Sequence, residues 1–327
     1  GYGYVPVISL SMTGLEKHPG FQLNLHLVRR MMYGVLYGDL LMTLVNQTKP
    51  YEVEPGSAQA LADKWTEQLA WEMTEGGKAN YRQVKANYKK ILDDFAALPV
   101  KRSDKVLVGI VGEIYVKYSP LGNNDLEKFL ASQDCEVNLP GLMGFVQYCA
   151  YNPSETARLY GGTFLEKHVS DVILDYIEGM EKVMIKVLKD NGFHAPLPFR
   201  ELVKLTDGVI STGNKMGEGW LLTAEMIELV KAGYENIVCA QPFGCLPNHI
   251  CGKGMINKIR ELYPQANITP IDYDPSATRV NQENRIKLML AVARERLAEK
   301  TAGQGAQESP TPTETARSAA EPQTASV

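Results

Sequence analysis

The fold is decided by one apolar run, Val106-Leu107-Val108-Gly109-Ile110-Val111-Gly112-Glu113. A continuous apolar segment of this length is typical of a strand buried on both faces of a parallel sheet. Two later segments, Ile237–Gln241 and Ile268–Tyr273, have the same character, and a helical pattern follows each of them. We expect these three strands to be parallel neighbours in one sheet, joined by right-handed crossovers.

Helical patterns fill the chain between and after these strands. They cover about 125–132, 155–191, 247–263 and 275–299, with a short strand expected at Cys135–Leu139. The last helix is expected to begin at Asp274-Pro275, because aspartate accepts hydrogen bonds at the N-cap and proline fits the first helical position. The predicted fold class is therefore α/β, a parallel sheet with flanking helices.

The segment before the first strand has a different pattern. Over residues 23–98, apolar residues recur at helical spacing, as in Leu27, Met31 and Val35, and we find no good strand candidate among them. We interpret this segment as a helical insertion outside the sheet. The short apolar run Val5–Leu10 precedes it and predicts a buried strand.

Four parts are expected along the chain. They are the end of a preceding α/β lobe (1–22), a helical segment (23–103), a C-terminal α/β lobe (104–300) and a disordered tail (301–327). The tail contains no aromatic residue, and Val327 is its only large aliphatic. Such a composition cannot bury enough apolar surface to offset the entropy of ordering the chain.

The composition excludes several classes of protein. A chain of 327 residues with 44% hydrophobic and 22% charged residues is ordinary for a globular protein of about two domains. The 34 basic and 38 acidic residues show no basic excess, so nucleic acid is not an expected partner. No apolar stretch approaches the roughly 18–20 residues that a membrane span needs.

The cysteine count indicates the compartment. Five cysteines, an odd number spread over a long chain, argue against a disulfide framework and for a reducing environment. Val5–Leu10 has neither the basic flank nor the cleavage site of a signal peptide. We therefore expect a cytoplasmic protein.

The most unusual segment is QPFGCLPNH, residues Gln241–His249, where a predicted strand meets a predicted helix. Open α/β sheets bind their ligands at this carboxyl edge. A thiol at Cys245 would lie near the positive end of a helix dipole, which favours thiolate, the form that binds iron or attacks an electrophile. The alternative is a cysteine packed as a small apolar residue.

Three further residues are candidate catalytic groups. His249 could tune the Cys245 thiol or only cap the helix. Glu218 lies between two glycines just before the helix Leu221–Lys231, where it could face a ligand or only stabilise the helix N-terminus. Glu113, with Lys117 nearby, is expected at the carboxyl edge of the sheet, although a buried salt bridge would give the same pattern.

The remaining cysteines are expected to be structural. Cys135 and Cys149 look like core residues, Cys239 lies within a predicted strand, and Cys251 lies within a predicted helix. Their spacing matches no zinc or ferredoxin pattern. The sequence also lacks a Walker A loop, a dinucleotide-binding glycine loop, a zinc-protease motif and a serine-hydrolase motif.

Four longer motifs resemble a known family. They are GEIYVKYSPLGNN (Gly112–Asn124), NKMGEGWLLTAEM (Asn214–Met226), QPFGCLPNHICGKGM (Gln241–Met255) and IDYDPSATRVNQENRIKLM (Ile271–Met289). Together they resemble the C-terminal region of the large proteins related to 2-hydroxyacyl-CoA dehydratases and their ATP-dependent activators.

This resemblance implies an iron–sulfur protein with two α/β lobes that grip a [4Fe–4S] or double-cubane cluster. By the matching motif, Cys245 would be a cluster ligand, and the other ligand cysteines would lie before Gly1. An upstream or separate ATP-dependent activator would deliver a low-potential electron. An acyl-CoA and a second copy of the chain are further implied partners.

Three functions remain open from the sequence. The first is a domain of a cluster-dependent reductase or dehydratase, with Cys245 as a ligand. The second is a non-catalytic docking module that completes such a redox assembly. The third is an isolated thiol-redox α/β domain.

Overall fold

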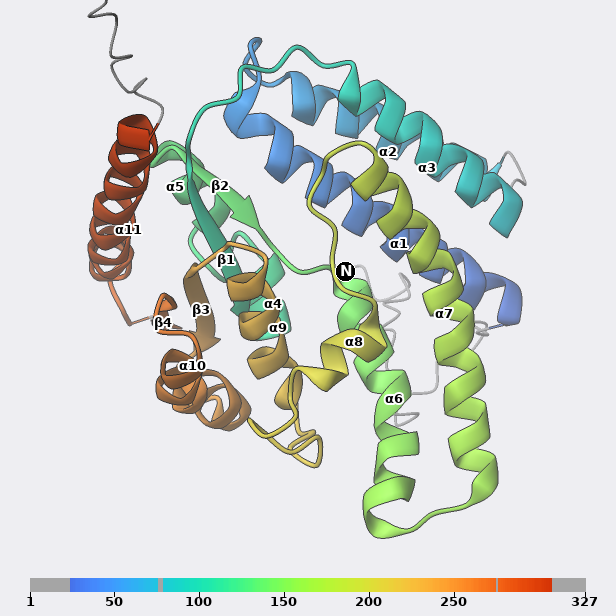
Figure 1. The fold of residues 1–327 in the computed structure, drawn as a ribbon. Helices are drawn as coiled ribbons and strands as arrows, with labels where there is room; N and C mark the ends of the chain where they lie inside the picture. The colour runs from blue at the N-terminus through green and yellow to red at the C-terminus, as the bar shows by residue number, and fades with distance from the viewer. Residues whose placement is uncertain (1–23, 76–78, 275, 308–327) are drawn as a thin grey trace, which may run out of the picture.

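The structure, a computed structural model, describes residues 24–75, 79–274 and 276–307 (Figure 1). The predicted strand Val5–Leu10, the proposed end of a preceding lobe at 1–22, and residues 308–327 of the predicted tail lie outside the described residues. Among the described residues, no helix combines the length and the apolar character needed to cross a membrane.

A four-stranded parallel sheet forms the centre of the α/β part. Its strands are β1 (Val106–Gly112), β2 (Cys135–Asn138), β3 (Asn236–Pro242) and β4 (Asn267–Tyr273). They lie in the order β2-β1-β3-β4, and every pair is parallel. The α/β fold class and the parallel pairing of the three predicted strands are therefore confirmed.

Helices cover both faces of this sheet. On one face lie α5 (Leu126–Ser132) and α11 (Arg279–Gln307), and on the other lie α9 (Trp220–Lys231) and α10 (Ile256–Leu262). Successive side chains of β3 alternate between the two cores, because side chains point to opposite faces along a strand. Burial on both faces explains why the strands are continuously apolar.

A helical layer lies beside the α/β part (Figure 1). It contains α1 (Leu25–Thr48), α2 (Ser57–Thr74) and α3 (Tyr81–Ala96), as the pattern over residues 23–98 predicts. The hairpin of α6 (Leu142–Tyr160) and α7 (Phe164–Asp190) packs into the same apolar core. The helical layer therefore also takes in residues far beyond position 103.

Two predicted helices are interrupted. The helix expected over 155–191 is divided between α6 and α7, and Gly161, with a φ of 82°, ends α6. The helix expected over 247–263 consists of a π turn, Asn248–Gly252, a 3-10 turn, Lys253–Met255, and then α10. Because no regular α-helix follows Cys245 directly, the peptide dipoles there are not aligned as in a helix.

Both predicted ends of the last helix are wrong. The Asp274 carboxylate accepts a hydrogen bond from the Ser276 N–H at 2.9 Å in a turn, and α11 begins only at Arg279. At the other end, α11 continues to Gln307, past the predicted start of the tail at Thr301. Extending an existing helix adds a hydrogen bond for each residue fixed, so a polar sequence can prolong it.

Buried carboxyl groups hold the helices of the helical layer together. Asp39 of α1 accepts hydrogen bonds from the Leu142 and Met143 N–H groups, each at 2.8 Å, and so holds the start of α6. Glu181 accepts one from Gln147 at 2.8 Å. These carboxyl groups line a cavity of about 40 Å³, which they share with residues of α9.

Burial raises the pKa values of these carboxyl groups. The pKa of Asp39 rises to about 6 and that of Glu181 to about 7. The pKa of Glu228, whose carboxylate accepts the Leu197 N–H at 2.6 Å, also rises to about 7. In each case desolvation opposes the charged form more strongly than the hydrogen bond favours it.

We expect the free energy of unfolding to fall as pH rises from 4.5 to about 7. In this window the folded chain binds more protons than the unfolded chain, because the carboxyl pKa values are higher in the folded chain. The stabilisation is therefore complete below the carboxyl pKa of the unfolded chain. It is lost as pH rises through the pKa of the folded chain. Each pKa unit corresponds to about 1.4 kcal/mol. Urea unfolding across this range measures the slope.

The variant Glu181→Gln removes one of the titrating groups and should flatten this slope. Glu201→Gln is the matched control, because Glu201 forms an exposed ion pair with Lys204. An unchanged slope in Glu181→Gln would contradict the assignment.

Candidate functional site

Cys245 lies in the turn that follows β3, at the carboxyl edge of the sheet. Gly244 adopts a φ of 75°, a conformation that glycine adopts without steric cost, and reverses the chain after Pro242. The Cys245 N–H then donates to the Pro242 carbonyl at 3.2 Å. The thiol is half-buried, so it is neither a surface group nor a core residue.

A buried amide connects Cys245 to Glu218. Asn248, which is fully buried, donates from Nδ2 to the Cys245 sulfur at 3.2 Å and to Glu218 Oε2 at 3.3 Å. The other oxygen of Glu218 accepts the Ile114 N–H at 3.0 Å. The structure therefore brings two of the predicted site residues together through a residue that the prediction did not include.

A tight backbone turn presents Glu218 to this site. Gly219 has a φ of 47°, and a Cβ atom there would lie 2.1 Å from the Asn214 carbonyl oxygen and 2.6 Å from the Tyr148 hydroxyl. Only glycine fits such a position. The Trp220 N–H closes the turn by donating to the Asn214 carbonyl at 2.8 Å.

Glu113 and Lys117 both have structural partners. Glu113 is the N-cap of the short helix α4 (Ile114–Tyr118), and its carboxylate accepts the Val116 N–H at 2.8 Å. Lys117 forms an ion pair with Glu225 at 3.0 Å, and each side chain is only 5% exposed. Burial raises the pKa of Glu225, and the charge of Lys117 opposes this rise. For Lys117, the buried salt bridge is the alternative that the structure supports.

The His249 side chain faces the strand. Its Nδ1 lies 3.3 Å from Nε2 of Gln241, and this Gln241 amide donates to Asp272 at 2.6 Å. The His249 backbone N–H donates to the Cys245 carbonyl at 3.0 Å. The side-chain contact to the sulfur comes from Asn248 and not from His249, for which tuning of the thiol was one of two predicted roles.

The other cysteines divide into two groups. Cys135, Cys239 and Cys251 are buried, and burial raises the pKa of Cys135 to about 11 and that of Cys239 to about 12. Cys149 is exposed, so its prediction as a core residue is wrong. It follows Tyr148 on α6, and a step of one residue along a helix turns the side chain away from the face that Tyr148 buries.

Large apolar side chains surround the Cys245 turn on the outside. Phe243 is 73% exposed, Leu246 67% and Ile250 51%. Met216 is also exposed and lies on the neighbouring loop, where a Cβ at Gly217 would lie 3.2 Å from Pro247. We call Met216, Phe243, Leu246 and Ile250 the apolar rim. Grouped exposed side chains of this size commonly mark an interaction surface.

The described residues around Cys245 can supply part of an iron–sulfur site, but they do not supply all of its ligands. Among the described residues, no group of three or more His, Cys, Asp or Glu side chains could hold a metal ion. Iron–sulfur clusters are held by several thiolates. The accessible sulfur of Cys245, with an N–H donor beside it, can supply one of these ligands.

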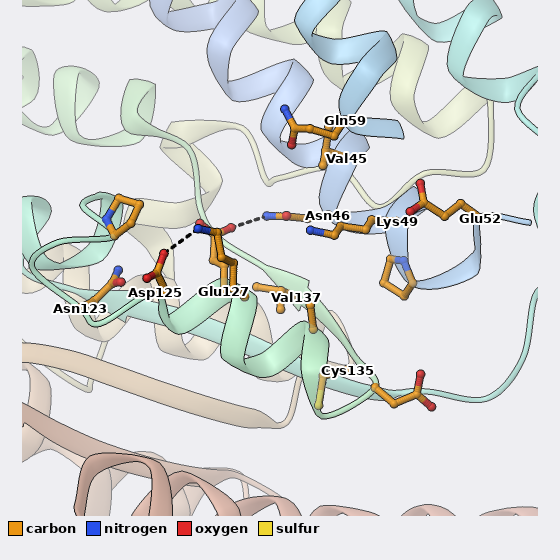
Figure 2. A pocket seen from close by; sticks show the side chains of 15 residues that line it. Val45, Asn46, Lys49, Glu52, Gln59, Asn123, Asp125, Glu127, Cys135 and Val137 are labelled. Carbon is orange, nitrogen blue, oxygen red and sulfur yellow. Dashed lines mark hydrogen bonds and ion pairs between the residues drawn. The ribbon is translucent and has the colours of Figure 1, made fainter. Parts of the chain in front are cut away.

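A separate cleft lies at the junction of the helical layer and the sheet (Figure 2). It has a volume of about 390 Å³, and two pairs of its polar side chains contact each other. Asn46 donates to Glu127 at 3.0 Å, and Lys128 pairs with Asp125 at 2.9 Å (Figure 2). Cys135 borders this cleft but is buried. Among the described residues of this cleft, no group of three or more His, Cys, Asp and Glu side chains could hold a metal ion.

Comparison of the chain with protein-family models, with curated proteins and with solved structures finds no match.

Sequence reasoning missed one residue of this site, Asn248, and mispredicted the burial of Cys149. The spacing of three residues between Cys245 and Asn248 could have identified Asn248, because such a spacing places two side chains on one side of a helical turn. No comparable signal was present for Cys149, whose exposure depends on how α6 packs.

We expect the variant Lys117→Met to destabilise the protein by about 3–5 kcal/mol, because it leaves the buried Glu225 carboxylate without its cation. The double variant Lys117→Met/Glu225→Leu should recover most of this loss, since apolar replacement of a whole buried pair is often neutral. Urea unfolding measures both variants. Lys128→Met, which breaks an exposed ion pair, is the control and should leave the midpoint unchanged. A loss of stability in Lys117→Met no larger than that in Lys128→Met would contradict the prediction.

Proposed function

We propose that this chain supplies one side of an iron–sulfur site in a cytoplasmic assembly of the 2-hydroxyacyl-CoA dehydratase and activator type, with Cys245 as a thiolate ligand. The observation that carries the proposal is the hydrogen bond from the buried Asn248 to the half-buried sulfur of Cys245, at the ligand-binding edge of the sheet. The motif around Cys245 supports the same assignment.

The surrounding groups suit the task of holding a thiolate ligand. An N–H donor beside a sulfur orients it and draws charge from it, and such hydrogen bonds are among the factors that set the potential of iron–sulfur clusters. Glu218 anchors the Asn248 amide, and the Ile114 N–H anchors Glu218. Glu218 is therefore a positioning residue in this proposal. Glu113 and His249 support the backbone around it.

A bound cluster would supply one-electron transfer at low potential. The remaining ligands would come from outside the described residues, and the ATP-dependent activator, upstream or separate, would provide the electron. An acyl-CoA as substrate and a second copy of the chain belong to the same proposal. The apolar rim gives the site a surface on which a partner could dock.

The second candidate is a docking module without a cluster of its own. The apolar rim favours it, because these side chains surround a single half-buried thiol. Iron content separates the two candidates, since a docking module would associate with the assembly without contributing a ligand.

We expect the chain alone to bind little iron after anaerobic reconstitution, and the complete assembly to bind a full cluster. In the assembly, Cys245→Ala should reduce both iron and acid-labile sulfide, because one iron loses its protein ligand. Cys135→Ala is the matched control, since Cys135 is buried away from this edge. A full cluster in the Cys245→Ala assembly would rule out the ligand assignment.

The apolar rim has its own test. We expect Leu246→Asp to weaken association with the partner region at least about tenfold, because a charge would be buried in the interface. The melting temperature should stay unchanged, since Leu246 is exposed. Val53→Asp, an exposed site on the helical layer, is the control in the same binding titration. Equal binding by the two variants would exclude the apolar rim as the interface.

A further inference from the structure

The cavity of about 40 Å³ lies between the helical layer and α9, and four carboxyl side chains line it. Asp39 of α1 and Glu181 of α7 come from the helical layer, whereas Glu225 and Glu228 come from α9. Each of the four residues is at most 8% exposed. We call them the acid cluster. Because the cavity is small, carboxyl groups from its two sides are held close together.

The charges of the acid cluster are only partly balanced. Lys117 of α4 pairs with Glu225 at 3.0 Å and so offsets one of them. The other three carboxyl groups accept hydrogen bonds from neutral donors, which are backbone N–H groups at Asp39 and Glu228 and a glutamine amide at Glu181. Like charges that share a buried site oppose full ionisation, so the acid cluster favours keeping protons.

The neighbouring titratable groups do not relieve this repulsion. On α7, Glu178 already pairs with Arg200 at 2.7 Å. Tyr88 of α3 and Tyr118 of α4 stay neutral, because burial raises the pKa of both phenols well above its usual value. Glu218, one turn of the chain before α9, is itself acidic and accepts the Ile114 N–H. The residues of α8 and of the loop before it that line the cavity are apolar: Pro196, Leu197, Phe199 and Leu202.

The helical layer and α9 also meet around Trp220, the first residue of α9. Trp220 is fully buried, and its ring centroid lies 5.1 Å from that of Tyr148 and 5.9 Å from that of Tyr151, both on α6. A Cβ atom at Gly219 would lie 2.6 Å from the Tyr148 hydroxyl. The packing of α6 on α9 therefore covers the turn that presents Glu218.

We propose that the acid cluster is a pH-sensitive switch, which keeps α9 packed on the helical layer while its carboxyl groups hold protons and loosens this packing when they ionise. Repulsion across the cavity then moves α9 away from α1 and α7, and the aromatic contacts of Trp220 open. Burial raises the pKa of Glu181 and of Glu228 to about 7, so the change occurs at and above neutral pH. The switch needs no iron and does not rest on the proposed function.

Quenching of Trp220 fluorescence by acrylamide tests the switch. The double variant Trp65→Phe/Trp71→Phe leaves Trp220 as the only tryptophan of the chain. We expect its quenching constant to rise at least about twofold between about pH 6 and about pH 8.5, because a local opening exposes a fully buried side chain. Far-UV circular dichroism should stay unchanged, since the helices move apart without unfolding. A quenching constant that does not change with pH would overturn the proposal.

Variants of the acid cluster show whether its ionisation causes the change. In the same background, Glu181→Gln/Glu228→Gln should abolish the rise in quenching, because the two amides cannot ionise. Glu201→Gln is the matched control, since it removes an exposed ion pair with Lys204, and it should leave the rise intact. A rise of equal size in Glu181→Gln/Glu228→Gln would show that another group titrates and would overturn the proposal.

Hydrogen exchange of the wild-type chain is an independent measurement that needs no tryptophan substitution. The Trp220 and Leu221 N–H groups donate to the carbonyls of Asn214 and Glu218 at 2.8 and 3.0 Å, and these bonds close the turn. After correction for the intrinsic effect of pH, we expect these amides to exchange at least about tenfold faster at about pH 8.5 than at about pH 6. Amides of α11, on the other face of the sheet, should remain better protected than those of the turn. No acceleration in the turn, or equal exchange in the turn and in α11 at the higher pH, would overturn a local switch.

Discussion

The arrangement of the site depends on one close backbone approach between β1 and β3. At Gly112, where φ is 153°, a Cβ atom would lie 1.9 Å from the Ala240 carbonyl oxygen, so no other residue fits. The next N–H, that of Glu113, donates to the same carbonyl at 3.1 Å. This contact brings the start of α4 beside the end of β3. It thereby places the Ile114 N–H where it can bind Glu218 and, through Asn248, orient the Cys245 sulfur.

The polar groups behind this edge have unequal roles. Lys117 and Glu225 form an ion pair in the interior, and Glu113 caps a helix. All three side chains therefore have structural partners within the protein. Glu218 and Asn248 differ because their hydrogen bonds lead outward to a half-buried thiol. A carboxylate that accepts a backbone N–H and an amide donor is held firmly in place, which is what a ligand-orienting residue requires.

Buried acid groups hold the helices of the helical layer that lie next to the site. Asp39 holds the start of α6, and Gln147 with Glu181 ties α6 to α7. α6 also carries Tyr148, whose hydroxyl lies against Gly219, so these contacts help to hold α6 beside the Glu218 loop. Their raised pKa values link the geometry of this region to pH.

The sequence by itself determined the architecture of the sheet. Continuous apolar runs such as Val106–Val111 can be satisfied only by burial on two faces, so strand identity and parallel pairing followed from pattern alone. The placement of Cys245 after β3 followed from the same reasoning. Helix ends were predicted less well, as Asp274 shows, because a capping residue can equally stabilise a turn.

Only the tertiary structure decided which side chains meet at the site. Asn248 rather than His249 contacts the thiol, because the chain after Cys245 forms a π turn instead of a regular helix. Cys149 is exposed because Tyr148 takes the buried face of α6. Local sequence records periodicity, whereas the direction of a side chain depends on what packs against its element. The partners of Glu218 come from segments far apart in the chain, and only folding brings them together.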